Sequence, residues 1–227
     1  MNVLSKKRTL INLNLAVFIA MLSFPVVASG QDSNFGNWMM YFGNKQINSK
    51  WNLHHEVQYR NYNAIGDLEQ LLLRAGLGYN ITESTNVLVG YGYVLSENYI
   101  GDTNEKFQVN EHRIYQQVIS KQKFNGISVQ HRYRFEQRFV EDDFKLRFRY
   151  FLGANVPLSK KETNRCYLSA YNEIFINTES KVFDRNRLYG GFGYKISDSV
   201  RVELGYMNQF FETGSRDQLN LITFVNF

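Results

Sequence analysis

The chain contains almost no proline and almost no cysteine, and each shortage restricts the folds that it can adopt. Pro25 and Pro157 are the two prolines in 227 residues, and Cys166 is the single cysteine. Proline cannot donate a hydrogen bond to a β-ladder, so its scarcity is typical of a chain built from fully paired strands. A single cysteine excludes an intrachain disulfide, so the fold must be stable without one.

The net positive charge is also small once the N-terminal segment is set aside. Residues 6–8 are three cations, residues 10–27 are mostly apolar, and residues 28–30 are small. This order predicts a secretory signal peptide over residues 1–30, rather than a transmembrane anchor, followed by one domain over residues 31–227. That domain contains 23 lysine and arginine residues and 21 aspartate and glutamate residues, so the composition does not imply a nucleic-acid partner.

The chain also lacks a second apolar run long enough for a transmembrane helix, and its mean hydropathy is −0.38. What it has instead is 15 tyrosines, 18 phenylalanines and long runs in which apolar and polar residues alternate. Residues 131–139, HRYRFEQRF, place arginines and a glutamate on one face of a strand and mainly aromatic side chains on the other.

The alternating runs are about 10–14 residues long, roughly twice the length of an average soluble strand. A tilted strand that crosses a bilayer needs roughly 9–11 residues. We therefore expect an all-β fold, a closed antiparallel transmembrane β-barrel of about 10–12 strands. The alternative is a soluble β-sandwich or a lipocalin-like barrel, which would place the aromatic side chains inside and the charges outside.

The number of strands is harder to predict. Ten runs fall between residues 50 and 227, and residues 35–43 form an eleventh candidate. Bacterial single-chain barrels have even numbers of strands, so either residues 35–43 are not a full strand of the wall or a twelfth strand has been missed. Short turns near residues 82, 123, 160 and 197 should share one side of the barrel. Longer loops near residues 64, 102, 141, 181 and 214 should share the other.

In such a barrel the charged phase of the alternation would point into the lumen, where ionised side chains find water or a counter-charge. Interleaved arginine and glutamate can fill a small barrel only if they are paired. The predicted lumenal charges are Glu56, Arg60, Arg74, Glu111, Arg113, Arg132, Arg134, Glu136, Arg138, Arg147, Arg149, Glu173 and Arg187.

The last residues form an apolar column that ends in an aromatic residue. Leu219, Leu221, Thr223, Val225 and Phe227 share one phase of the final run. This resembles the C-terminal signature by which the assembly machinery recognises Gram-negative outer-membrane barrels.

Several blocks of the sequence resemble a known group. These blocks are residues 111–113, 131–139, 147–150, 172–173, 183–187 and 205–209. They are similar to the shared blocks of domain-of-unknown-function family 2490, whose members are small bacterial outer-membrane barrels. The resemblance covers almost the whole chain after residue 30. It implies the fold and the location, and no activity.

Three functions fit these observations. The first is an integral outer-membrane barrel that is structural or passive, with its lumen filled by Arg–Glu pairs. The second is a narrow pore or binding barrel for small polar solutes, biased toward anions because arginines outnumber acids on the inward phase. Whether Glu56, Glu111, Glu136 and Glu173 neutralise the arginines should separate these two.

The third function is an outer-membrane lipid A deacylase or phospholipase with its catalytic groups on the lipid-facing surface. Its candidate residues are His55, His112 and His131 as bases and Ser96, Ser120 and Ser128 as nucleophiles, although no nucleophile motif surrounds them. We therefore assign no catalytic residue and expect no metal or other cofactor. The expected partners are outer-membrane lipid and lipopolysaccharide, periplasmic chaperones and the barrel assembly machinery.

Overall fold

A computed structural model describes residues 35–227, except 65, 160, 162 and 180. The expected signal peptide, residues 1–30, lies outside the described residues. Among the described residues there is no helix long and apolar enough to cross a membrane.

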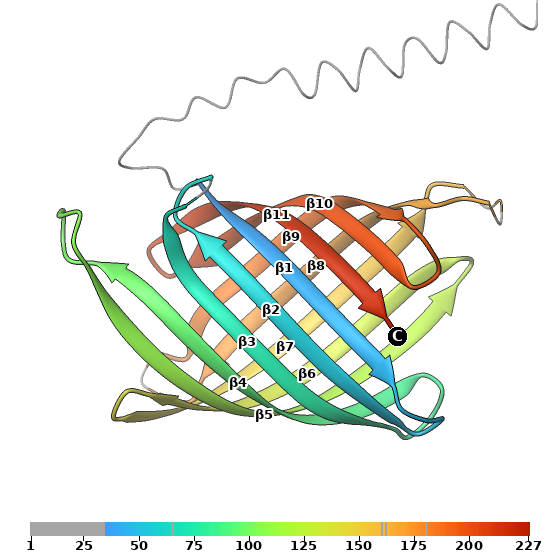
Figure 1. The fold of residues 1–227 in the computed structure, drawn as a ribbon, viewed down its shortest axis with the longest axis horizontal. Helices are drawn as coiled ribbons and strands as arrows, with labels where there is room; N and C mark the ends of the chain where they lie inside the picture. The colour runs from blue at the N-terminus through green and yellow to red at the C-terminus, as the bar shows by residue number, and fades with distance from the viewer. Residues whose placement is uncertain (1–34, 65, 160, 162, 180) are drawn as a thin grey trace, which may run out of the picture. The chain divides into compact units, whose positions relative to one another are not determined.

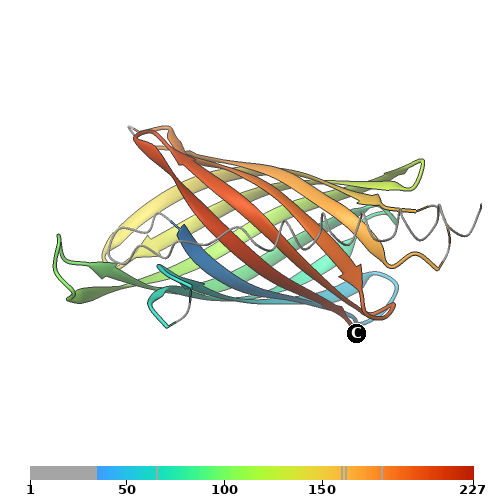
Figure 2. The same cartoon turned by 90° about the horizontal axis from the view of Figure 1, so that it is seen from above.

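Eleven β-strands form one sheet that closes into a barrel, which confirms the predicted all-β fold and its closure (Figure 1). The strands are tilted, as closure of a sheet requires, and this is clearest in Figure 2. They contain 11 to 19 residues each. Their bounds are β1 Phe35–Gln46, β2 Trp51–Asn61, β3 Leu68–Asn80, β4 Thr85–Tyr99, β5 Lys106–Phe124, β6 Ile127–Val140, β7 Asp143–Pro157, β8 Cys166–Asn177, β9 Phe183–Lys195, β10 Val200–Phe211 and β11 Gly214–Asn226.

The number of strands is odd, so the expectation of an even number was wrong. β1 is a full strand of the wall, and the described residues contain no twelfth. β1 pairs antiparallel with β2 and parallel with β11, in a register that runs from Phe35↔Asp217 to Asn44↔Asn226. An odd number of up-and-down strands makes the first and last strands run in the same direction, so the barrel closes with one parallel pair. We call this pair the seam.

The parallel seam places the two termini of the described chain at opposite ends of the barrel. The Phe35 end carries the β2–β3, β4–β5, β6–β7, β8–β9 and β10–β11 connections. The Phe227 end carries the other five. The predicted grouping of the connections is therefore confirmed, but the predicted difference in length is not. The connection over residues 158–165 at the Phe227 end is the longest, whereas residues 141–142 and 212–213 at the Phe35 end are two-residue turns.

The β5–β6 turn shows how local chemistry fixes the register. Asn125 and Gly126 have φ angles of 49° and 87°. Two successive positive φ angles are the signature of a type I′ turn, whose twist matches that of the flanking strands, and Asn-Gly is the preferred pair there. The turn therefore sets the pairing Phe124↔Ile127 that begins the long β5–β6 ladder.

The two faces of the wall differ in polarity, with apolar side chains outside and charges inside. Val89, Tyr133 and Leu204 on the outer face are 59%, 54% and 53% exposed. Arg134 and Glu136, which alternate with Tyr133 along β6, are buried on the inner face. The alternation in the sequence thus separates an apolar exterior from a charged interior.

An aromatic cluster covers the seam at the Phe227 end. The His55 ring lies 5.4 Å from the Tyr41 ring and 5.8 Å from the Phe227 ring, between centroids. It also lies directly over Gly43, where a Cβ atom would overlap it. The Phe227 amide donates to the Asn44 carbonyl at 2.9 Å, so the last residue of the chain is hydrogen-bonded to β1.

Inside the barrel, two tyrosine rings lie over glycine backbone. A Cβ atom on Gly193 would overlap the Tyr167 ring, and one on Gly205 would overlap the Tyr189 ring. Both hydroxyls reach Glu203, with Tyr167 donating at 2.8 Å and Tyr189 at 3.4 Å. The glycines therefore provide the space in which these rings pack flat against the wall.

This packing predicts that Gly193→Ala destabilises the barrel. We expect its free energy of unfolding to fall by about 1–3 kcal/mol, because the methyl group must displace the Tyr167 ring. Gly190→Ala is the matched control, since nothing lies within 4 Å of its added Cβ. Urea unfolding of the detergent-folded protein measures both variants. Equal stabilities would contradict the packing described here.

Candidate functional site

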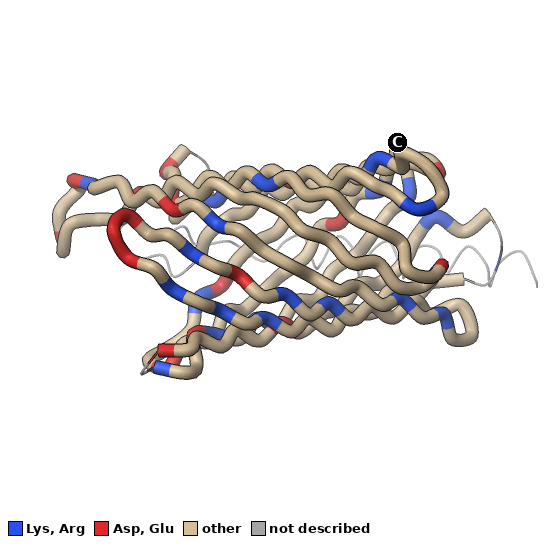
Figure 3. The backbone as a smooth tube through the Cα atoms, turned by 90° about the horizontal axis from the view of Figure 1, so that it is seen from below, with Lys and Arg blue, Asp and Glu red and all other residues tan. Residues whose placement is uncertain are grey.

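The structure places all thirteen predicted lumenal charges on the inner face of the barrel. Eleven of them are buried, and the side chains of Arg132 and Arg138 are 17% exposed. Charged positions recur along neighbouring strands of the wall and are not confined to the connections (Figure 3).

Glu136 on β6 is the centre of this charge cluster and is 0% exposed. Its carboxylate accepts hydrogen bonds from Arg147 at 2.6 Å and from Arg149 at 2.7 Å. The guanidinium groups of Arg134 and Arg74 lie 3.6 and 3.9 Å from the same carboxylate. One buried carboxylate therefore holds together arginines from β3, β6 and β7.

Arg149 extends the network to a second carboxylate. It donates to Glu173 on β8 at 2.7 Å as well as to Glu136. Glu173 also accepts from Arg132 at 2.7 Å, and Arg187 lies 3.9 Å away. Two of the four predicted glutamates are thus joined through one guanidinium, as the fork geometry of arginine allows.

Glu111 and Glu56 make more local pairs. Glu111 accepts from Arg113 at 2.6 and 2.7 Å and also from Arg138. Glu56 accepts from Arg74 at 2.7 Å. Because Arg74 also faces Glu136, the Glu56 pair is linked to the central cluster.

Three lumenal carboxylates were missed by the sequence reasoning. Glu203 on β10 follows the regular alternation and is buried, whereas β-bulges place the other two. The register of β8 and β9 shifts so that Asp184 has no opposite residue, and its carboxylate lies 2.9 Å from Arg147. The register of β2 and β3 shifts near Glu69, whose carboxylate lies 2.7 Å from Arg216 on β11. A bulge adds one residue and breaks the alternation, so a strict period of two cannot find these positions.

Aromatic and amide side chains of the lumen were also missed, although the alternation in the sequence places them on the same face as the charges. Tyr115 and Gln117 share the phase of Arg113 on β5. The Arg134 guanidinium lies 4.6 Å from the Tyr115 ring centroid and donates to the Gln117 carbonyl at 2.6 and 2.9 Å. The arginines are therefore held by rings and amides as well as by carboxylates.

The lumenal charges do not balance. Nine arginines and four glutamates make up the predicted set, and the missed side chains add the carboxylates of Glu69, Asp184 and Glu203 and the guanidinium groups of Arg201 and Arg216. Arg60 has no carboxylate oxygen within 4.0 Å in the described part of the chain. Its guanidinium donates instead to the side-chain carbonyls of Gln58 and Gln70. The four glutamates thus do not neutralise the arginine column.

The β2–β3 connection is held at the Phe35 end by contacts with β5 and β11. Lys106 forms an ion pair with Asp67, and both Lys106 and Arg216 face the Tyr62 ring, at 5.4 and 5.0 Å. Burial, and then the Glu69 carboxylate, raise the pKa of the Tyr62 hydroxyl above its ordinary value. Tyr62 is therefore a neutral ring between two cations at this mouth of the barrel.

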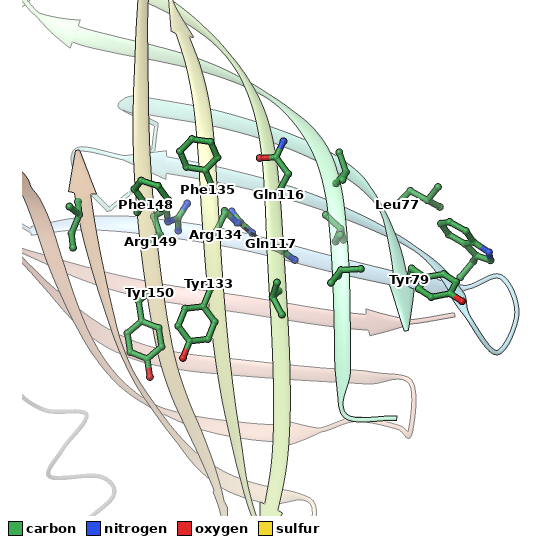
Figure 4. A pocket seen from close by; sticks show the side chains of 16 residues that line it. Leu77, Tyr79, Gln116, Gln117, Tyr133, Arg134, Phe135, Phe148, Arg149 and Tyr150 are labelled. Atoms are coloured by element: carbon green, nitrogen blue, oxygen red, sulfur yellow. Dashed lines mark hydrogen bonds between the residues drawn. The ribbon is translucent and has the colours of Figure 1, made fainter. Parts of the chain in front are cut away.

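The outer wall carries an apolar groove of about 630 Å³ between β2 and β8 (Figure 4). Tyr133 packs on Tyr150 and Phe135 packs on Phe148 along one side, with ring centroids 5.0 and 4.6 Å apart. Gln116, also in the lining, exchanges hydrogen bonds of 3.1 and 3.3 Å with the Gln137 amide. The Gln116 amide of the lining thus has its own partner.

The three histidines proposed as catalytic bases do not meet the serines proposed as nucleophiles. His112 bonds the Tyr91 hydroxyl, His131 lies 2.9 Å from the Tyr150 hydroxyl, and His55 packs in the seam cluster. Within the described residues no hydrogen bond joins Ser96, Ser120 or Ser128 to any of them. Ser96 accepts from Gln70 at 2.8 Å, and Ser120 is opposite His131 in the ladder without bonding it.

The predicted C-terminal column faces outward at the seam. Leu219, Leu221 and Phe227 are 38%, 46% and 63% exposed, and Val225 is half-buried on the same face. In the described part of the chain, no three or more His, Cys, Asp or Glu residues are grouped to hold a metal ion.

The central cluster predicts a large cost for Glu136→Gln. The amide would leave four guanidinium groups without their shared carboxylate, so we expect a loss of about 3–5 kcal/mol in unfolding free energy. Glu212→Gln is the control, because Glu212 pairs with Lys181 at 4.0 Å and both are exposed. Its loss should stay below about 1 kcal/mol. Denaturant titration of the two folded variants tests the contrast, and similar losses would show that the cluster is not central.

Comparison with known proteins supports a family but no activity. The model of a protein family of unknown function, DUF2490, matches residues 35–220. An uncharacterized protein of Methylorubrum extorquens is 31% identical over 163 residues, which cover 68% of this chain and 69% of that protein. No solved structure matches. The charged, closed β-barrel described above therefore belongs to the DUF2490 family.

Proposed function

We propose that this chain is an integral outer-membrane β-barrel of a Gram-negative bacterium, closed in the lumen and passive rather than catalytic. The observation that supports this most strongly is the polarity of the wall. Large apolar side chains are exposed all round the outside, whereas eleven predicted lumenal charges are buried inside. A water-soluble barrel has the opposite arrangement, and lipid is the solvent that favours this one.

The burial of side chains in the interior supports a closed lumen. Tyr115 on β5, Glu136 on β6, Met207 on β10 and Gln218 on β11 are each 0% exposed. These residues come from opposite parts of the wall, so side chains from both sides fill the interior between them. An open porin would instead have solvent in contact with its inward side chains.

The proposed partners follow from the proposed location. The apolar exterior would contact outer-membrane lipid, and lipopolysaccharide in the outer leaflet. The column that ends at Phe227 would be read by the barrel assembly machinery after delivery by periplasmic chaperones. Because Phe227 is hydrogen-bonded to β1 in the closed barrel, that recognition would have to precede closure of the seam.

Single-channel recording tests the closed-barrel proposal. The detergent-folded protein, with its heat-shifted gel band as proof of folding, would be added to a planar bilayer in 1 M salt. We expect insertion without discrete conductance steps. Regular steps from the folded wild type would overturn the closed lumen.

One observation favours a second candidate, a narrow anion-biased pathway. Arginines exceed carboxylates in the lumen, and Arg60 has amide partners in place of a carboxylate. In that case the recorded steps should have a reversal potential that indicates selectivity for anions. The lipid-hydrolase hypothesis has no comparable observation in its favour. His112 and His131 bond tyrosines, His55 packs against rings, and no hydrogen bond joins a candidate serine to any of them in the described part of the chain.

Membrane insertion also predicts which side of the membrane each end of the barrel reaches. If the Phe227 end faces the periplasm, the β1–β2 turn also faces the periplasm, and the β4–β5 connection faces the outside of the cell. In a Cys166→Ser background, Asp102→Cys should react with an impermeant maleimide on intact cells. Asn48→Cys should react only after the outer membrane is permeabilised. Labelling of both positions on intact cells would contradict a membrane-spanning wall.

A further inference from the structure

Two lumenal arginines meet at one tryptophan near the Phe35 end of the barrel. The guanidinium carbon of Arg60 on β2 lies 3.8 Å from the Trp38 ring centroid, and that of Arg187 on β9 lies 4.8 Å from it. All three side chains are at least nine-tenths buried. Two like charges are thus held close together in a site that water barely reaches.

These two guanidinium groups are held mainly by neutral oxygens. Arg60 donates to Gln58 and Gln70, and Arg187 donates through Nε to the Gln209 carbonyl at 2.9 Å. The carboxylate nearest to Arg187 is Glu173, at 3.9 Å. Elsewhere in the lumen, glutamate carboxylates accept directly from most of the guanidinium groups, and Arg134, which donates to Gln117, is an exception. Here the two guanidinium groups donate to amide oxygens. An anion would bind them more strongly, since hydrogen bonds between two charged groups are about twice as strong as those between neutral groups.

Further unused donors lie on the same inward face. Trp38 pairs with Arg60 across the β1–β2 ladder, and its indole Nε1 has no hydrogen-bond partner among the described residues. The Gln218 side chain on β11 is 0% exposed and is likewise unpartnered in the described part. A buried donor left unsatisfied is costly, so an acceptor that entered here would recover free energy.

The site lies close to a mouth of the barrel. Arg60 is followed by the last residue of β2 at the Phe35 end. The Arg185 side chain, two residues before Arg187 toward that end, is 30% exposed. Elsewhere in the interior, Met207 and Glu136 are fully buried. An ion that entered from the Phe35 end would therefore reach Arg60 and Arg187 and stop there.

We propose that Arg60 and Arg187, together with the Trp38 indole N–H, form a binding site for a small oxyanion such as phosphate or sulfate. The ion displaces the amide oxygens of Gln58 and Gln209 and accepts hydrogen bonds from both guanidinium groups. The inference rests on the closed lumen proposed above, which makes the site a dead end rather than part of a conduction path.

Tryptophan fluorescence provides a direct readout. The chain has two tryptophans, so Trp51→Phe on the outer wall leaves Trp38 as the sole reporter. The detergent-folded variant would be titrated with sodium sulfate, and separately with sodium phosphate, at an ionic strength held constant with sodium chloride. We expect a saturable shift of Trp38 emission, together with a rise in unfolding midpoint that follows the same concentration dependence.

Two variants in the same background identify the site. Arg60→Gln should weaken the apparent affinity by about tenfold or more, because it removes one charged donor pair. Gln209→Glu should abolish the response while keeping the barrel folded, because it supplies a carboxylate to Arg187 within the protein. Arg201→Gln is the matched control. It removes one inward charge at the Phe227 end, where Arg201 stacks on Phe224 at 3.9 Å, and should leave the titration unchanged.

Three results would overturn the proposal. They are a linear response without saturation, a response equal to that of sodium chloride, or an unchanged titration in Gln209→Glu. None of these would affect the closed-barrel proposal, because the heat-shifted gel band and the bilayer recording are scored on the wild type beforehand. Conversely, discrete conductance with a saturable sulfate response would retain the site and reject the dead end.

Discussion

The structure depends on one constraint: arginines buried inside a barrel need carboxylates, and the barrel has few of them. Glu136 is shared by four guanidinium groups, and Arg149 links it to Glu173. Removing ions from water costs several kcal/mol each, and only close pairing and further hydrogen bonds offset that cost. Rings such as Tyr115 and amides such as Gln117 supply the remaining contacts. The interior is therefore one connected network rather than a set of separate pairs.

This network also explains how the wall is held in shape. Contacts between neighbouring strands are supplied by the backbone ladder, but several ion pairs join strands that are not neighbours. Arg74 on β3 reaches Glu136 on β6, Arg132 on β6 reaches Glu173 on β8, and Glu69 on β3 reaches Arg216 on β11. Such contacts bridge over the intervening strands on the inner face and help to fix the cross-section of the barrel. The polar interior thereby takes the structural role that an apolar core has in a soluble protein.

The closure of the barrel adds a second constraint. Eleven strands require a parallel seam, and parallel pairing is slightly less stable per residue than antiparallel pairing. Side chains reinforce the seam on both faces. Tyr41, His55 and Phe227 pack on the outside, while Met40 on β1 and Ile222 on β11 belong to the buried cluster inside.

Carboxylates are too few near Arg60 and Arg187, so these guanidinium groups donate to side-chain amide oxygens instead. This is where an external anion is expected to bind.

The sequence by itself determined the strands, the two faces of the wall and the phase of the charges. A period of two is a local property, so Arg134 and Glu136 could be assigned to the lumen, and Tyr133 to the outside, without knowing which strands are neighbours. The tertiary structure alone decided the rest. Pairing partners such as Glu173 for Arg132 depend on which strands lie near each other in the closed wall. The lumenal positions of Asp184 and Glu69 depend on bulges that break the period. Whether residues 35–43 belong to a full strand of the wall was decided by the pairing of β1 with β11, because closure is a property of the whole sheet and no single segment encodes it.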